Sequence, residues 1–306
     1  MNIGCPIIFN YRARRWKKME LKEEWFIEYI ENANKKWSNE TLRQVQIDLK
    51  QAKSFVVDGY FNEQEYIQYL NEHLKTKTIL RKITTMRNFC NYLCEQDYIN
   101  YNPFISITKN YTTPSSQLPT LTLSEIKEVQ SIVEKRVKDA KSDAKVFTTT
   151  RDQAMIECLI NTGIRSSELF QLKLENIDLE SGCINIEGVH ERKRTLQLNP
   201  SVIQYLKKYI SLLDIENSDF IFRTRSNKTL NDLQLRKILI SISKESSSLA
   251  DIHLTPMMFR NTYCKLLIEK GIHPVAICKV MGIKQINPQL WKTIEIDTNI
   301  KINVFE

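Results

Sequence analysis

The stretch T-G-I-R-S-S-E-L-F-Q-L-K, from Thr162 to Lys173, places a glycine, an arginine and a glutamate between two helical patterns. Gly163 can take the positive φ with which one helix ends before the next begins. Ser166 is placed to cap the new helix, and Glu168 can pair with and orient the guanidinium of Arg165. The stretch predicts a helix-turn-helix corner at which an arginine meets a phosphate. Taken alone, it equally fits a corner with a surface arginine.

Three segments of the chain together resemble the tyrosine recombinases, the phage integrase family. The first runs from Arg151 to Leu179, contains the stretch above and is similar to the start of that family's catalytic core. The second is T-P-M-M-F-R-N-T-Y, from Thr255 to Tyr263, which resembles the second arginine box. The third is G-I-H-P-V-A-I-C-K-V-M-G, from Gly271 to Gly282, which resembles the helix pair leading to the nucleophile. Their order and spacing also match the family.

The resemblance implies a specific chemistry. In that family two arginines clamp the scissile phosphate, proton donors serve the leaving oxygen, and a tyrosine attacks to give a 3′-phosphotyrosine. Developing phosphate charge requires planar bidentate donors, the leaving oxygen requires a general acid, and the intermediate requires a nucleophile. The resemblance assigns the two clamp positions to Arg165 and Arg260.

Other positions depart from the family pattern. Met257 and Ile283 stand where the family has histidines, and neither side chain can transfer a proton. The family's hairpin carries a lysine soon after a glycine, but Gly188 is followed by valine and histidine. Arg192 or Lys193 is the alternative, reaching in from further along the turn.

The expected nucleophile is also missing. The family places it near Trp291 to Thr293, yet no tyrosine occurs among residues 264–306. Tyr263 is predicted to pack within its helix, and Trp291 to be either a packing aromatic or a hydrogen-bond donor. Thr293 is a weak substitute nucleophile, because an alcohol of high pKa needs a base. Without a tyrosine, the two arginines would only bind a phosphate.

Composition is that of an ordinary globular protein. The 306 residues suffice for two domains, with 42% hydrophobic and 26% charged residues. No run approaches the roughly 20 apolar residues that span a bilayer, and the first residues lack the features of a signal peptide. The seven cysteines lie mostly in apolar helical contexts. We therefore expect a cytoplasmic protein with free thiols, no metal and no cofactor.

Basic residues gather in two N-terminal runs, within a formal net charge of +8. One extends from Arg12 to Lys18, and the other lies between Glu72 and Glu95 without an acidic residue. Either run alone fits a solvated face, but two favour a surface that contacts phosphates and releases counterions. We predict double-stranded DNA as the partner, contacted by Lys77, Arg81, Lys82 and Arg87, and by Arg192 and Lys193 of the later hairpin.

Apolar periodicity predicts a mainly α protein with four parts. These are a basic arm (1–19), a four-helix domain (20–105), a linker rich in Thr, Ser and Pro (106–119), and a helical domain with a small antiparallel β-sheet (120–306). The helices of the first domain are expected over 21–33, 38–57, 62–74 and 78–95. Its position resembles that of the family's SAM-like core-binding domain, so that the linker would let two domains close around a duplex.

The second domain is predicted as the integrase-like catalytic domain. Ser124 is expected to cap a helix over 125–139, and further helices are expected over 201–213, 230–244, 256–270 and 274–281. Short strands are expected over 177–179, 183–186 and 195–198.

These observations predict a DNA-binding protein of the tyrosine recombinase family, associated with site-specific DNA recombination and integration and impaired or inactive in strand cleavage. It would act on DNA as a homo-oligomer or beside an active recombinase. Two alternatives remain open: an active recombinase with a rearranged nucleophile, and a non-catalytic helical DNA-binding regulator.

Overall fold

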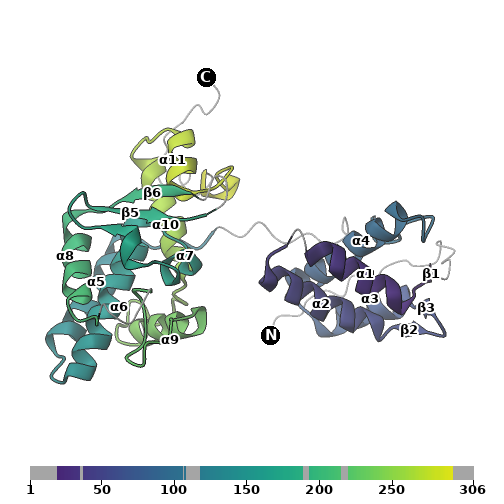
Figure 1. Ribbon diagram of the computed structural model, residues 1–306, viewed down its shortest axis with the longest axis horizontal. Helices are drawn as coiled ribbons and strands as arrows, with labels where there is room; N and C mark the ends of the chain where they lie inside the picture. The colour runs from purple at the N-terminus through teal and green to yellow at the C-terminus, as the bar shows by residue number, and fades with distance from the viewer. Residues whose placement is uncertain are drawn as a thin grey trace. The chain divides into compact units, whose positions relative to one another are not determined.

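The computed structural model describes residues 19–34, 37–105, 107, 118–188, 193–214 and 220–291. The chain divides between Ser116 and Gln117 into two compact units (Figure 1), and each is described by itself.

The N-terminal unit contains four helices around one core. They are α1 (Glu23–Asn34), α2 (Asn39–Lys53), α3 (Glu63–His73) and α4 (Thr76–Glu95). α4 contacts each of the other three, and its apolar face is fully buried at Ile83, Met86 and Phe89. Aromatic rings fill much of this core: Phe26 stacks on Phe89 with ring centroids 4.6 Å apart.

A small antiparallel sheet, which the sequence analysis missed, closes one end of this unit. Its strands are β1 (Met19–Glu20), β2 (Val56–Val57) and β3 (Tyr60–Phe61), in the order β1-β3-β2. α2 was expected to continue to residue 57, but it ends at Lys53. The two valines instead pair with β3 through a turn in which Asp58 and Gly59 both have positive φ, the geometry of a tight hairpin.

The C-terminal unit is built on α6 (Asp143–Thr162), which packs against α5 (Leu123–Lys138), α8 (Pro200–Ile210) and α10 (Pro256–Glu269). α9 (Asp232–Ser243) covers α5. Most of α6 is buried, and it ends at Gly163, at the corner predicted from the stretch Thr162 to Lys173. α5 is capped by Thr122 and not by the expected Ser124, because Thr122 and Glu125 form a reciprocal capping box.

The predicted sheet of this unit is confirmed. Its strands are β4 (Ile177–Asp178), β5 (Cys183–Ile186) and β6 (Arg194–Gln197), antiparallel and in the order β4-β5-β6. α7 (Ser166–Phe170) follows the corner, and α11 (Pro274–Met281) lies beside β6 (Figure 1). The mainly α class is therefore confirmed.

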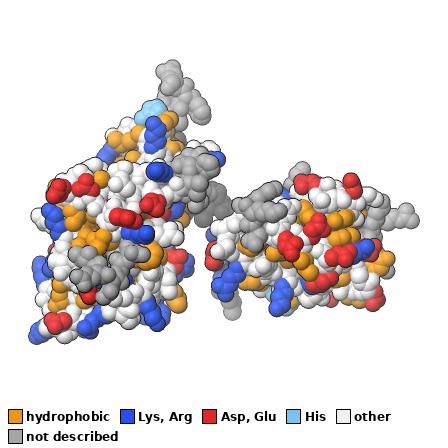
Figure 2. Space-filling view, viewed as in Figure 1, with side chains coloured by type: hydrophobic (Ala, Val, Ile, Leu, Met, Phe, Trp, Pro, Cys, Tyr) orange, Lys and Arg blue, Asp and Glu red, His pale blue; other side chains and the backbone are white. Residues whose placement is uncertain are grey.

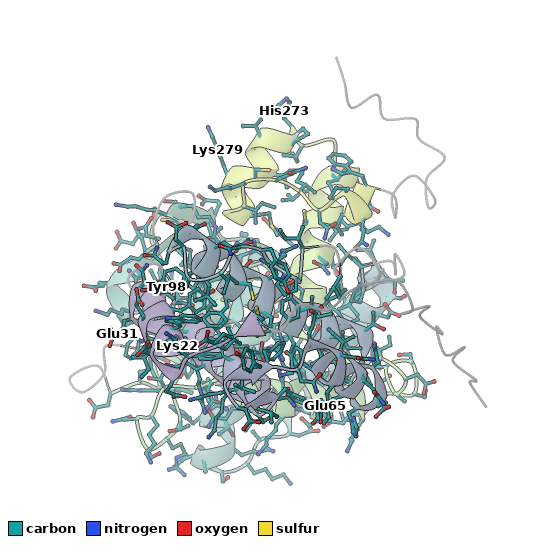
Figure 3. The ribbon with its side chains drawn as sticks, turned by 90° about the vertical axis from the view of Figure 1, so that its right-hand side faces the viewer. Lys22, Glu31, Glu65, Tyr98, His273 and Lys279 are labelled. Carbon is teal, nitrogen blue, oxygen red and sulfur yellow. The ribbon has the colours of Figure 1, made fainter. Side chains whose placement is uncertain are left out.

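Surface charge on the N-terminal unit is mixed. In the view of Figure 2, acidic side chains crowd the middle of the unit, and basic ones lie mainly along its lower edge. His273, which caps the start of α11, and Lys279 of that helix both point away from the body of the C-terminal unit (Figure 3). Within the described ranges, no helix has the length and apolar character needed to span a bilayer.

Candidate functional site

Arg165 lies at the corner between α6 and α7. α6 ends because Gly163 takes a φ of 59°, a left-handed conformation that glycine adopts without strain. The carboxylate of Glu168 then reaches back to the start of α7. Its Oε2 accepts the backbone N–H of Arg165 at 2.9 Å, and its Oε1 accepts from Arg165 Nη1 at 2.8 Å. Glu168 therefore performs the capping expected of Ser166 and also orients the arginine.

Arg260 meets the same corner from α10. Its Nη1 donates to the carbonyl of Gly163 at 2.5 Å, and its Nη2 donates to the carbonyl of Met281. Burial lowers the pKa of Arg260 to about 10, and the positive charge of Arg165 adds to the shift. The guanidinium consequently keeps its charge at neutral pH. The two arginines predicted as a clamp do lie together in the fold.

A third arginine, Arg194, completes the cluster and was missed by the sequence analysis. Its Nη1 and Nη2 donate to the two carboxylate oxygens of Glu168, each at 2.9 Å, and its side chain is 5% exposed. The signal was strand alternation. Arg194 begins β6 and lies two and four residues before the buried Leu196 and Leu198, so it faces the interior with them.

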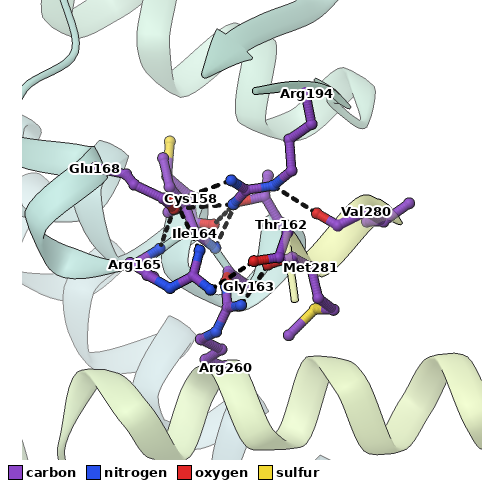
Figure 4. A network of polar contacts seen from close by, with 11 residues as sticks. Cys158, Thr162, Gly163, Ile164, Arg165, Glu168, Arg194, Arg260, Val280 and Met281 are labelled. Atoms are coloured by element: carbon purple, nitrogen blue, oxygen red, sulfur yellow. Dashed lines mark hydrogen bonds and ion pairs between the residues drawn. The ribbon is translucent and has the colours of Figure 1, made fainter. Parts of the chain in front are cut away.

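The end of α11 aligns all three arginines (Figure 4). The carbonyl oxygens of residues 280, 281 and 282 accept, in that order, from Arg194, Arg260 and Arg165. The last carbonyls of a helix lack intrahelical partners and carry the negative end of the helix dipole. The end of α11 thus presents partial negative charge to the three guanidiniums.

The charge of the cluster is strongly positive. Burial raises the pKa of Glu168, but hydrogen bonds from Arg194 and from the backbone of Arg165 outweigh this effect and lower it to about 2. Glu168 is therefore ionised near neutral pH. Among the described residues of the cluster, three guanidiniums and one carboxylate give a net charge of +2, which favours binding of an anion at this corner.

Two features favour glycine at position 282. It ends α11 with a φ of 59°, and a Cβ atom there would lie 2.9 Å from Nη1 of Arg194. Gly163 is similarly constrained, since a Cβ atom would lie 2.6 Å from Cδ1 of Tyr263. Both glycines of the sequence motifs thus allow close approach between elements of the site.

The positions expected to transfer protons hold apolar side chains. Met257 lies on the first turn of α10 and is 58% exposed. Ile283 packs with the cluster of Cys264, Ile268 and Leu290. Lys193 is exposed and lines a hollow of about 870 Å³ beside the β5–β6 hairpin, together with Gly188 and Arg194. Arg192 lies outside the described residues.

Of the candidate nucleophiles, only Tyr263 lies among the described residues, and its surroundings do not activate it. Tyr263 packs its ring over Gly163, and burial raises its pKa, which disfavours the phenolate. Trp291 packs partly buried against the same apolar cluster as Ile283. Thr293 lies outside the described residues. Within the described ranges, no three His, Cys, Asp or Glu side chains gather in a way that would hold a metal ion.

The predicted DNA contacts of the N-terminal unit fall into two groups. Lys77 is exposed, and Arg87 is partly exposed. Lys82, in contrast, is buried, and its Nζ lies 2.8 Å from Oδ1 of Asp48, which also pairs with Arg81. Because its ammonium neutralises a buried carboxylate, Lys82 is a structural residue and is not available at a DNA surface. Arg81 remains 40% exposed at its side chain.

Comparison with known proteins identifies the family. The sequence profile of the phage integrase family matches residues 121–288, more than half of the chain. A tyrosine recombinase of Agathobacter rectalis is 30% identical over 265 residues, covering 80% of this chain and 86% of that protein. Tyrosine recombinase XerC of Staphylococcus saprophyticus is 25% identical, covering 83% of this chain and 86% of that protein. The chain belongs to the phage integrase family of tyrosine recombinases, as the resemblance implied.

Solved structures share the fold. The Tn1549 transposon integrase, in complex with transposon right end DNA, superimposes with a TM-score of 0.68 at 18% identity, over 92% of this chain and 96% of that chain. A lambda integrase dimer bound to a COC′ core site gives a TM-score of 0.66 at 14% identity, over 94% of this chain and 81% of that chain.

Proposed function

We propose that this chain binds double-stranded DNA at a recombination site, holds a backbone phosphate with Arg165 and Arg260, and does not cleave the strand. The observation that carries the proposal is the composition of the arginine cluster. Its described residues carry a net charge of +2, while Met257 and Ile283 occupy the proton-transfer positions. Such a site has the donors for a phosphate and lacks the groups for bond cleavage.

The family supports the DNA part of this proposal. Both solved structures described above hold DNA, and the lambda integrase is a dimer on its site. A binding role without cleavage would let the chain occupy recombination sites as a homo-oligomer or beside an active recombinase.

The alternative of an active enzyme with a rearranged nucleophile has less support. Tyr263 is the last tyrosine of the sequence, and burial raises its pKa. Substitution of the two arginines distinguishes the proposal from the other alternative, a regulator that binds DNA without the arginine cluster. For such a regulator, replacing Arg165 or Arg260 would leave the affinity for DNA unchanged.

A mobility-shift titration tests the proposal. Arg165→Lys and Arg260→Lys keep the charge but remove the planar fork, and we expect each to weaken binding of a cognate duplex about tenfold, near 1.4 kcal/mol. Arg225→Ala, which removes an exposed arginine elsewhere in the unit, is the control and should bind like the wild type. Circular dichroism establishes that the variants fold. Folded lysine variants with wild-type affinity would refute the phosphate role.

A further inference from the structure

Polar side chains follow one face of α4 along its length. A helix turns by about 100° per residue, so residues three and four apart lie on the same side. Lys77 and Arg81 are four residues apart, Asn88 follows two turns after Arg81, and Asn91 lies three residues further, so the four share one side of the helix. Each is exposed or partly exposed. This face therefore has cations in its first half and carboxamides in its second.

The two asparagines border a hollow of about 250 Å³ between α1 and α4. Aromatic side chains form much of its lining: Tyr29 meets Trp37 edge-on with ring centroids 5.8 Å apart, and Tyr29 lies 5.3 Å from Tyr92 by the same measure. The hollow thus combines carboxamides with aromatic carbon.

Asn91 is held in a fixed orientation. Asn102 donates from its Nδ2 to Oδ1 of Asn91 at 2.6 Å, and the same Nδ2 donates to the carbonyl of Arg87 at 2.8 Å. Asn91 thus presents its amide N–H groups and the second lone pair of its oxygen. Asn88 lies one turn earlier and is exposed.

The lining of the hollow disfavours a phosphate as its occupant. Glu95 is its only charged lining residue among those described, and a carboxylate repels phosphate oxygens. An uncharged ligand edge with hydrogen-bonding groups fits better. The major-groove edge of an A·T pair provides this, because adenine offers N7 as acceptor and N6 as donor beside the thymine methyl group. Carboxamides pair with that adenine edge, and apolar carbon contacts the methyl group.

We infer that this face of α4 reads A·T base pairs, with Asn88 and Asn91 addressing adenine and the aromatic lining receiving the thymine methyl. Lys77 and Arg81 contact phosphates beside that base pair. The inference rests on the proposed DNA binding and adds the sequence preference and the residues that determine it.

Selection from randomised duplexes with the full chain, followed by mobility shifts of a selected duplex, tests the inference. The wild type should select A·T at one or two adjacent positions, and replacement of that pair with G·C should weaken binding about tenfold, within the usual cost of a mismatched pair. Replacement of the adenine by 7-deazaadenine, which lacks the N7 acceptor, should also weaken binding.

Single-residue variants show whether Asn88 and Asn91 cause the preference for A·T. Asn88→Ala and Asn91→Ala should bind the A·T and G·C duplexes within about twofold of each other, because base contacts of this kind supply the discrimination. Asn39→Ala, an exposed asparagine at the start of α2, is the matched control and should keep the preference. Thermal melts monitor folding.

The outcomes separate the inference from the proposed function. The inference would be overturned if the folded Asn88 and Asn91 variants still preferred the A·T duplex over the G·C duplex as strongly as the wild type does. Selection of G·C at these positions by the wild type would also overturn it. Either result would leave the proposed DNA binding intact. Absence of any duplex binding by the wild type would overturn both.

Discussion

Gly282 determines how closely α11 approaches the arginine cluster. Gly282→Ala places a left-handed φ on a residue with a Cβ atom, which costs about 1 kcal/mol, and forces the new methyl group against Arg194. Gly271→Ala is the matched control, since Gly271 has a φ of 72° and nothing within 4 Å of its added Cβ. Urea unfolding should show a larger loss for Gly282→Ala. Equal losses of unfolding free energy in the two variants would mean that the Arg194 side chain moves aside without a loss of stability.

Protonation of Glu168 makes the C-terminal unit less stable as the pH falls into the acid range. Its folded-state pKa of about 2 lies below the ordinary value of 4.5. The stabilisation is therefore complete above about pH 5 and is lost as the pH falls toward 2. Glu168→Gln should be less stable at neutral pH and show a flatter decline in the urea midpoint between pH 5 and 2. Glu180→Gln, an exposed control, should follow the wild type. Parallel profiles for wild type and Glu168→Gln would contradict this account.

The packing of α2 on α4 depends on Asp48. Its side chain is 1% exposed and pairs with Arg81 and with the buried Lys82. Asp48→Asn leaves the Lys82 ammonium buried without a counter-charge, a loss of about 3–5 kcal/mol in comparable cases. Hydrogen exchange should accelerate throughout α4. Glu40→Gln, in the first turn of the same helix α2, should leave α4 protected. Unchanged exchange after Asp48→Asn would show that Lys82 reaches solvent.

Helices and strands could be predicted from the sequence where a periodic pattern of neighbouring residues determines them. The buried stripe of α4 and the β5–β6 pairing follow from periodicity, so they were predicted close to their observed bounds. The sheet of β1, β2 and β3 was missed because its two-residue strands carry no measurable period, although Asp58-Gly59 marked the turn.

The candidate site was predictable in part for the same reason. Arg165 and Arg260 stand in short motifs. Strand alternation turns Arg194 inward, but it does not indicate the partners that Arg194 meets when β6 packs against α7 and α11. The burial of Lys82 depended on Asp48, 34 residues earlier, which no local pattern indicates.

At the scale of the molecule, each unit has its own core. Separate buried clusters lie on the two sides of the division between Ser116 and Gln117. We expect two transitions in calorimetry, because independent cores unfold independently. Asp48→Asn should lower the midpoint of one transition only, and Gly282→Ala that of the other. A single transition shifted by both variants would show that the units unfold together.

Binding without cleavage at the arginine cluster can be tested with nicked duplexes that trap a covalent intermediate. Adducts are sought on a denaturing gel, and a mobility shift of the same mixture measures binding. We expect a shifted complex that Arg165→Lys weakens, and no covalent band. A covalent band would show that the chain cuts DNA, and loss of that band in Tyr263→Phe or Thr293→Ala would identify the attacking residue.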